Sequence, residues 1–499
     1  MLALVIFSAF LLFLSFPSPF FLMGIHGLAW IFAVPLFFAI QKKSLFHRIF
    51  IGILFGIVFY SFLVFWLGDY SPAGFWIFVF FLTIQPLFFC IGYSFCFHNK
   101  IAEILYVPSL WVVSEHFRTM MMGGFSWGIS HSQSFNIYAI QVANLLGTSC
   151  VSFVLIFVNY CIYKAIQEKK ERRFYVLSMA VVLSGVFVYG VWNIFQYQQS
   201  LEKKKSVLLG SVQPNIDFYK KLHEEYVDEV VDRQILLTAQ VLTQHNPDLI
   251  VWPETAIPFD FSGEEKTCRK MDELFQRVKT PFLLGSVVSQ GGENYNSALF
   301  YNREGKLLGT YSKNQLIPFS EYMPHSKVGI LFSDFFKIKR FDFSRGEKKE
   351  IFLLKNQRIL KGIPFGVLIC SEDMTGKFFR EYALLGADFM IVLLNDGWLK
   401  KGEAYLLHAQ NTIMHAVENK MPILRAANTG WTILIDAVGR PSEKRVHHFN
   451  EAKVFLHKLI PRMKTSIYSR IGNVFSLMCS CFVIINWMLS LNLRKKNEK

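Results

Sequence analysis

The sequence predicts a helical membrane protein with an α/β domain inserted before its last membrane span. Three observations lead to this fold class. The 499-residue chain is 52% hydrophobic with 52 phenylalanines, and its mean hydropathy is positive, which is too apolar for a soluble protein of this length. Apolar segments of about span length fill the first part of the chain and recur near its end. Between them lies a stretch of roughly 260 residues with the mixed pattern of an α/β domain.

Eight segments approach the ~20 residues that are needed to cross the hydrocarbon core of a bilayer. They lie at 2–22, 27–40, 49–67, 74–97, 101–117, 137–163, 174–195 and 471–491. The first segment has no basic start and contains Pro17 and Pro19, so we interpret it as an uncleaved span and not as a signal peptide. We therefore expect about eight membrane spans.

Clusters of lysine and arginine follow the second, fourth, sixth and eighth spans, whereas the alternate loops carry almost no positive charge. By the positive-inside rule both termini are cytoplasmic, and the segment between the last two spans lies outside. Lys203, Lys204 and Lys205 disagree with this orientation, but the four concordant loops outnumber them. Membrane topology thus accounts for the net charge of +15, and no nucleic-acid partner is predicted.

The chain accordingly divides into four expected parts. These are a seven-span domain over 1–200, an extracytoplasmic α/β domain over 203–463, a membrane helix over 470–492 and a basic cytoplasmic tail over 493–499. Periodicity in the second part predicts strands at 206–212, 249–252, 281–288, 297–301, 307–311, 363–369, 389–394 and 423–426. It also predicts one helix that starts near Tyr226 and ends at Asn246-Pro247, and another over 403–420. We expect mixed sheets that are covered by helices.

Three predicted strand ends carry polar residues that together suit acyl transfer. Glu254 follows the strand at 249–252, Lys313 follows the strand at 307–311, and Cys370 ends the strand at 363–369. Taken singly each has an ordinary structural explanation, because free cysteines are commonly buried and charged residues commonly follow strands in solvated loops. Taken together they supply a base, a cation and a thiol, which is what transfer through a thioester requires.

This ordered set resembles the Glu-Lys-Cys triad of the carbon–nitrogen hydrolase (nitrilase) superfamily, with Glu254 in VWPET, Lys313 in SKNQLIPFSE and Cys370 in LICSED. The spans around it narrow the resemblance to the bacterial apolipoprotein N-acyltransferases. It is supported by PSLWVVSEHFR, GGFSWGISHSQ, SVQPNI, YNSALFYN and LRAANTGWTILIDAVGR, and it covers nearly the whole chain. The resemblance implies a nitrilase-type α-β-β-α sandwich on the outer, periplasmic face of the bacterial cytoplasmic (inner) membrane.

The resemblance also implies a reaction, the final step of lipoprotein maturation. Cys370 would take an acyl chain from a phospholipid, with phosphatidylethanolamine as the expected donor, and hold it as a thioester. The amine of a diacylglyceryl-cysteine in an apolipoprotein would then accept the chain as an amide. Glu254 would act as general base, and Lys313 would stabilise the oxyanion and favour the thiolate. Glu321 and Glu372 match two further family positions and are expected to orient Lys313 or the active-site loops.

Two departures from the family lie where substrate would be held. Ser371 stands where an aromatic residue is common, and residues 217–222 lack a tryptophan that tends to follow the QxNI segment. Both bear on acyl-chain preference and head-group recognition and not on the chemistry.

Two further features suggest a route for lipid. The apolar, aromatic and basic stretch 328–343 is expected to form a lid on the outer leaflet through Phe335 and Phe336, with a buried core segment as the alternative. Glu115 and Arg118 lie near the outer end of the fifth span, where ionisable residues are costly unless used or paired. They are expected to contact the soluble domain or a lipid head group.

No metal or cofactor is expected. His408 and His415 are seven residues apart on a predicted helix, His447 and His448 are adjacent in a loop, and none has clustered ligand partners. Only Cys268 and Cys370 lie in the polar part, so no disulfide framework is predicted there.

Two alternative functions stay open at this point. A membrane-anchored amidase or nitrilase-type hydrolase would use the same triad and give the acyl group to water, although eight crossings exceed what an anchor needs. A transporter or scaffold whose outer domain has lost activity is the other alternative, and the intact triad argues against it.

Overall fold

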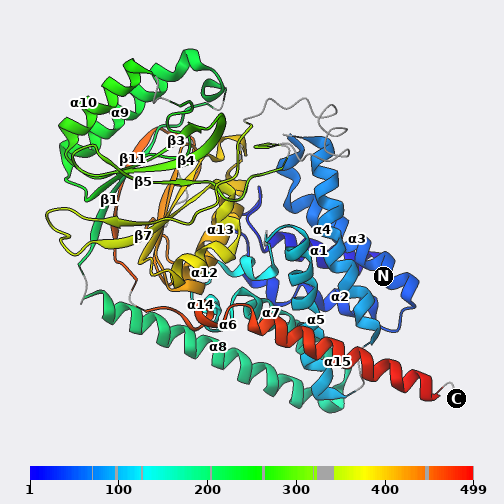
Figure 1. Ribbon diagram of the computed structural model, residues 1–499. Coiled ribbons are helices and arrows are strands. Elements are labelled where there is room, and N and C mark those ends of the chain that lie inside the picture. The colour runs from blue at the N-terminus through cyan, green and yellow to red at the C-terminus, as the bar shows by residue number, and fades with distance from the viewer. Residues whose placement is uncertain are drawn as a thin grey trace. The chain divides into compact units, whose positions relative to one another are not determined.

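The computed structural model (Figure 1) describes the chain except for Tyr70, Phe218, Phe319, Lys400, Met463 and residues 96–98, 125–126, 203–204, 261–263, 323–341, 444–448 and 498–499. The described chain divides into two compact units. The helical unit consists of Met1–Gln199, Leu406–Asn419 and Ser466–Lys499. The α/β unit consists of Ser200–Tyr405 and Lys420–Thr465.

The helical unit contains helices from both ends of the chain: α1 (Leu2–Leu14), α2 (Ala33–Ile40), α3 (Leu45–Leu63), α4 (Pro72–Gly92), α5 (Lys100–Met121), α6 (Ala143–Leu146), α7 (Thr148–Gln167), α8 (Arg172–Leu201), α14 (Ile467–Ile471) and α15 (Val474–Asn497). Five segments of the described chain are long and apolar enough to cross a membrane, namely Leu45–Leu63, Pro72–Phe95, Thr148–Gln167, Lys169–Leu201 and Val474–Leu491. Leu2–Leu14 and His26–Ile40 are shorter apolar helices. The chain is therefore a multi-pass membrane protein with about five candidate spans.

The fifth predicted span corresponds to α5, whose polar residues set it apart from the candidate spans. It begins with Lys100 and Glu103 and carries Glu115 and Arg118 near its end. These charges lower the hydropathy of a helix that is otherwise long enough to cross a membrane. The count of eight spans stays a prediction.

Small residues let two of the spans pack closely. A Cβ added to Gly56 of α3 would lie 2.7 Å from Thr83 of α4, and one added to Gly52 would lie 2.8 Å from the backbone of Leu87. Close backbone approach through small residues is a common way for membrane helices to associate, because lipid offers no hydrophobic driving force between them.

The α/β unit is built on two mixed sheets. The six-stranded sheet has the order β11-β1-β2-β3-β4-β5 and the five-stranded sheet the order β10-β9-β8-β7-β6. The strands are β1 (Val207–Gln213), β2 (Leu249–Val251), β3 (Phe282–Gln290), β4 (Glu293–Tyr301), β5 (Leu307–Ser312), β6 (Ile351–Leu354), β7 (Ile363–Ile369), β8 (Phe389–Leu394), β9 (Ile423–Ala427), β10 (Ile433–Ile435) and β11 (Lys453–Leu459).

Aromatic contacts show that the two sheets pack against each other. The ring of Phe300 in β4 lies 5.4 Å from that of Phe352 in β6 and 5.2 Å from that of Phe365 in β7, between ring centroids. Helices α9 (Val227–Gln244) and α10 (Glu265–Val278) share a buried core with β1, β2 and β3. Helix α12 (Gly376–Leu384) lies on β7, because Tyr382 occupies the space beside Gly366. The unit is therefore a nitrilase-like sandwich, with its two sheets visible in Figure 1.

All eight predicted strands occur, and those at Ile363–Ile369 and Phe389–Leu394 have the predicted ends. The two predicted helices correspond to α9 and to α13 (Gly402–Asn419). From Leu406 onward α13 belongs to the helical unit, although it was expected within the domain at 203–463. Strands β6, β10 and β11 and helices α10 and α12 were not predicted. β6 and β10 are very short, and β11 carries two lysines and a histidine among its seven residues.

Candidate active site

Cys370 lies at a sharp corner immediately after strand β7, which lies between β8 and β6. It is the first residue of the short helix η9 (Cys370–Met374), and its φ of +51° places it in the left-handed region. A residue other than glycine in that region costs of order 1–3 kcal/mol and persists only where the surroundings hold it. The side chain is buried, with 6% of the residue exposed. The predicted strand-to-loop corner is therefore present, and it is strained.

Glu254 lies in the turn that follows β2, and the neighbouring strand leaves room for this turn. A Cβ added to Gly285 of β3 would lie 2.4 Å from the carbonyl oxygen of Pro253, so no larger residue fits there. Thr255, which follows Glu254, has a φ of +44°. The Asn296 side chain donates a hydrogen bond of 2.8 Å to Oε1 of Glu254. The Glu254 carboxylate is thus buried, and a side chain of β4 holds it in place.

Lys313 follows β5 and is fully buried between two carboxylates. Its Nζ lies 2.6 Å from Oε1 of Glu321 and 3.7 Å from Oε1 of Glu254. The other oxygen of Glu321 accepts a 2.9 Å hydrogen bond from the Ile317 backbone N–H. Glu321 therefore ties down Lys313, which is one of the orienting roles expected from the sequence.

The acidities of the three groups depend on one another. Burial raises the pKa of Glu254 and outweighs the opposing effect of Lys313. Burial alone would lower the pKa of Lys313, but Glu321, Cys370 and Glu254 together raise it above its usual value, so the ammonium stays charged.

Lys313 favours the thiolate of Cys370, as expected, but it does not determine the state of this residue. Burial and then Glu254 raise the pKa of the thiol well above its usual value, and the lowering effect of Lys313 is smaller. The resting residue is therefore a neutral thiol, and a nearby base is needed to take its proton as it attacks.

Glu372 joins the corner after β7 to the loop after β5. It is completely buried, and its carboxylate accepts hydrogen bonds from the backbone N–H groups of Ile369 (2.9 Å), Asn314 (2.6 Å) and Gln315 (3.0 Å). The Tyr311 hydroxyl lies 2.9 Å from each carboxylate oxygen. Burial raises the pKa of Glu372 to about 7 despite these donors. The carboxylate links the segment with Cys370 to the segment with Lys313.

A buried ion network behind Cys370 was missed in the sequence. The Arg425 guanidinium from β9 contacts Asp373, and its Nη2 lies 3.4 Å from Oδ2 of Asp396. All three side chains are fully buried, and the charge of Asp396 acts on the Cys370 thiol. The signal was present in the segment LRAANTGWTILIDAVGR, where an arginine interrupts an otherwise apolar strand.

The structure describes Ser371 but not the two phenylalanines of the expected lid. The Ser371 hydroxyl is buried beside Cys370 and has no hydrogen-bond partner among the described residues. Phe335 and Phe336 lie outside the described residues, as does most of 328–343. Phe343 is described, and its backbone N–H donates a 2.9 Å hydrogen bond to the Glu321 carbonyl.

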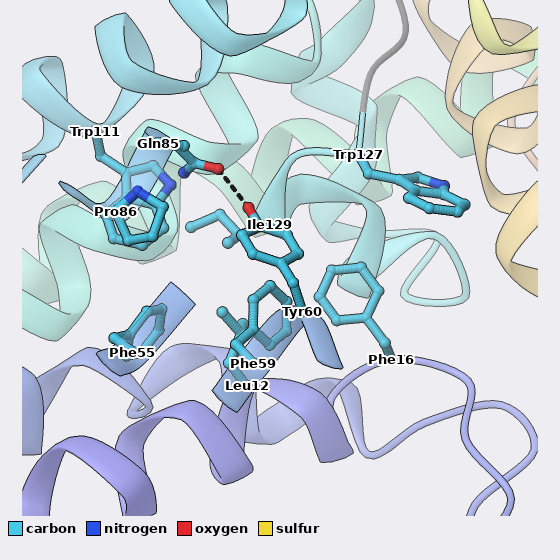
Figure 2. Close-up of a pocket in the computed structure, with 10 residues that line it drawn as sticks. All are labelled: Leu12, Phe16, Phe55, Phe59, Tyr60, Gln85, Pro86, Trp111, Trp127 and Ile129. Carbon is cyan, nitrogen blue, oxygen red and sulfur yellow. Dashed lines mark hydrogen bonds between the residues drawn. The ribbon is translucent and has the colours of Figure 1, made fainter. Parts of the chain in front are cut away.

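Glu115 and Arg118 lie buried inside the helical unit and form hydrogen bonds with other residues of this unit. Glu115 accepts hydrogen bonds from the indole of Trp111 (2.9 Å) and the backbone of Ile129 (2.7 Å). Arg118 donates to the Tyr60 hydroxyl (2.8 Å) and to Gln85 (2.7 Å). Figure 2 shows Tyr60 and Gln85, themselves hydrogen-bonded, in the wall of a pocket that is otherwise mostly aromatic and apolar.

Candidate metal ligands do not gather in the part of the chain that the structure describes, where no group of three or more His, Cys, Asp or Glu side chains could hold an ion. His408 and His415 are buried residues of α13. His447 and His448 lie outside the described residues.

Known proteins match both parts of the chain. The family model of the apolipoprotein N-acyltransferase N-terminal domain matches residues 8–161, and that of the carbon–nitrogen hydrolases matches residues 208–459, half of the chain. The apolipoprotein N-acyltransferase of Geobacter metallireducens is 28% identical over 95% of this chain and 92% of its own length. That of Borreliella burgdorferi is 25% identical over 99% and 96%.

Solved carbon–nitrogen hydrolases are similar to part of the chain. An amidase from Nesterenkonia sp. covers 54% of this chain and 94% of its own, with 15% identity and a TM-score of 0.39. The two family models cover successive parts of the chain, one the membrane helices up to residue 161 and the other the sandwich that holds Glu254, Lys313 and Cys370. Because that combination runs through the near full-length relatives as well, this chain belongs to the apolipoprotein N-acyltransferase family of the carbon–nitrogen hydrolase superfamily.

Proposed function

We propose that this chain moves an acyl chain from a phospholipid to the N-terminal amine of a diacylglyceryl-cysteine lipoprotein, through a thioester on Cys370. Apolipoprotein N-acyltransferase activity in lipoprotein maturation is the activity of its family. The observation that carries the mechanism is the buried cluster in which Lys313 lies 3.7 Å from Glu254 and both charges act on the Cys370 thiol.

In the first half-reaction Glu254 takes the proton of Cys370 as its sulfur attacks the ester carbonyl of the phospholipid. The carbonyl oxygen gains negative charge, which the Lys313 ammonium stabilises. The tetrahedral intermediate then collapses, the carbon–oxygen bond breaks, and Glu254 returns its proton to the leaving lysophospholipid oxygen. The acyl chain remains on Cys370 as a thioester.

In the second half-reaction the lipoprotein amine attacks the thioester carbonyl. Glu254 takes a proton from this amine, Lys313 again stabilises the oxyanion, and the carbon–sulfur bond breaks as the amide forms. The proton passes to sulfur and restores the Cys370 thiol. In this scheme Glu321 orients Lys313, and Glu372 holds the segment that carries Lys313 at a fixed position relative to the segment that carries Cys370.

The finer membrane arrangement is part of the same proposal. Eight spans, cytoplasmic termini and a catalytic domain over 203–463 on the periplasmic face would put Cys370 on the side where lipoproteins are matured. Phosphatidylethanolamine is the proposed donor. A lid formed by Phe335 and Phe336 and a role of Ser371 in acyl-chain preference stay proposals. So does a head-group contact of Glu115 and Arg118, whose hydrogen bonds within the helical unit instead support helix packing.

The test uses the full chain in mixed micelles with acyl-labelled phosphatidylethanolamine. The wild type should form a labelled, hydroxylamine-sensitive acyl-enzyme and pass the label to the amine of a diacylglyceryl lipopeptide. Cys370→Ala should form none, whereas Cys268→Ala, which removes a thiol on α10, should behave like the wild type. A covalent acyl-enzyme in Cys370→Ala would contradict the nucleophile, and label that appears only as free fatty acid would favour a hydrolase.

A further inference from the structure

Lys221 is a buried lysine behind the turn that carries Glu254. It belongs to the short helix η7 (Lys220–Leu222), and only 1% of the residue is exposed. Its Nζ donates a hydrogen bond of 3.0 Å to the backbone oxygen of Glu254 and lies 3.5 Å from Oγ1 of Thr255. Both contacts are with uncharged groups, yet burying an ammonium costs far more than burying an amide or a hydroxyl. The charge of Lys221 therefore needs an explanation beyond these two contacts.

The backbone of the turn is already fixed by neutral donors. The Trp252 N–H donates to the Leu283 carbonyl at 2.9 Å, and the Ile257 N–H donates to the Gly285 carbonyl at 3.2 Å. The Gln234 amide donates to the Ala256 carbonyl at 2.9 Å. With three such bonds around it, the turn does not depend on a cation for its shape.

The carboxylate of Glu254, in contrast, shares its nearest lysine with Glu321. Lys313 lies 2.6 Å from Glu321 but 3.7 Å from Glu254, so most of its charge is committed to Glu321. The charged or titratable groups that act on Glu254 are Lys313, Glu321, Cys370 and Lys221. With Cys370 neutral, the two carboxylates are balanced only if both lysines carry their charge.

We propose that Lys221 is a positioning residue that supplies the second positive charge beside Glu254, and so keeps this carboxylate ionised and able to act as the general base. The inference rests on the proposed function, in which Glu254 accepts the proton of Cys370. Lys221 touches neither the thiol nor the substrate in this role and acts only through Glu254.

The effects of Lys221 and Glu254 on each other's pKa agree with this arrangement. Burial lowers the pKa of Lys221 to about 7, and the charge of Glu254 acts in the opposite direction. Lys221 in turn lowers the pKa of Glu254, against the raising effect of burial. Each charged form thus stabilises the other. Removal of the ammonium should raise the pKa of Glu254 further, and the acid side of the rate profile should then move to higher pH.

The test compares Lys221→Met, which removes the charge, with Lys221→Arg, which keeps it. Lys221→Gln retains a donor for the Glu254 oxygen without the charge, and it serves as the second neutral variant if Lys221→Met does not fold. Lys266→Met is the matched control, because Lys266 is an exposed residue of α10 whose ammonium pairs with Asp228. The rate of acyl-enzyme formation and the rate of Cys370 alkylation by iodoacetamide, measured on its peptide by mass spectrometry, are followed against pH.

The neutral variants should lose about tenfold in both rates, the order of magnitude expected when one charge is removed from a buried pair, and their acid limbs should move to higher pH. Lys221→Arg should keep the acid limb of the wild type at a reduced rate, and Lys266→Met should match the wild type. A uniform loss at all pH values, or an unchanged profile, would overturn the role of Lys221. A wild type that forms no acyl-enzyme would instead contradict the proposed function itself.

Discussion

Replacing Glu372 by alanine is expected to destabilise the α/β unit and to slow acylation, because this carboxylate joins two segments of the site. The N–H groups of Asn314, Gln315 and Ile369 would lose their acceptor. A buried N–H without a partner costs at least ~1 kcal/mol, so the three together cost ~3 kcal/mol or more. The Tyr311 hydroxyl can reorient and adds little to this sum.

For a domain of roughly 250 residues, this loss corresponds to a fall of about 6–12 °C in the midpoint of thermal unfolding. The chemical effect should be larger. Asn314 directly follows Lys313 and Ile369 directly precedes Cys370, so a looser link lets the ammonium drift from the position of the oxyanion. A displacement of about 1 Å can cost about a hundredfold in rate.

The assay pairs thermal unfolding of the detergent-solubilised chain with the single-turnover rate of acyl-enzyme formation. Glu372→Gln should fall between the alanine variant and the wild type, because its amide oxygen still accepts hydrogen bonds. Glu304→Ala, at an exposed pair with Arg303, is the control and should change neither quantity. If Glu372→Ala unfolds at the control temperature, the link is not structural. If it is destabilised but acylates at the wild-type rate per folded molecule, the link does not position the reacting groups.

Three further predictions follow from the same geometry. Glu321→Gln should move the acid limb of the pH–rate profile of acylation to lower pH. The substitution removes a charge that raises the pKa of Glu254, and it frees Lys313 to approach Glu254. A move to higher pH would contradict the pairing of Lys313 with Glu321. Arg425→Met should lower the free energy of unfolding, measured by thermal unfolding, by ~3–5 kcal/mol, because it removes the cation between two buried carboxylates. Adding Asp373→Asn and Asp396→Asn to this variant should recover part of the lost stability. Gly285→Ala should lower the free energy of unfolding by ~1–3 kcal/mol or more, because the added Cβ pushes on the Pro253 carbonyl. Gly291→Ala, in open space at a φ of +64°, should lower it by only ~1–2 kcal/mol. Equal losses would refute the close approach at Gly285.

The three strand ends that carry the candidate catalytic residues could be predicted from the sequence, because local apolar patterns are sufficient to locate the end of a strand. A run of apolar residues that stops at Cys370, Glu254 or Lys313 is visible without any knowledge of the sheets. The partners of these residues were harder to find. Asn296 lies inside a strand, Lys221 lies in a basic polar segment, and neither shows a signal at the level of periodicity that distinguishes it from a solvated residue.

The convergence itself could not be read from the strand pattern, because it depends on how two sheets stack. Glu254 and Lys313 follow β2 and β5 of the six-stranded sheet, whereas Cys370 follows β7 of the other. Only the resemblance to known families placed them together. Likewise, helical spacing predicted α13 correctly, but nothing in its period indicated that the helix belongs with the membrane helices from Leu406 onward.

Burial and then Glu254 raise the pKa of the Cys370 thiol well above its usual value, so a thiolate does not form ahead of the reaction. A thiolate reacts readily with electrophiles and oxidants, whereas a buried neutral thiol reacts slowly. Lys313 lowers the pKa of the thiol too little to offset this rise, and its short contact with Glu321 holds its ammonium in place. In the proposed mechanism, proton transfer to Glu254 would therefore accompany attack on the acyl carbonyl, and the fixed ammonium would stabilise the charge that develops on the substrate oxygen.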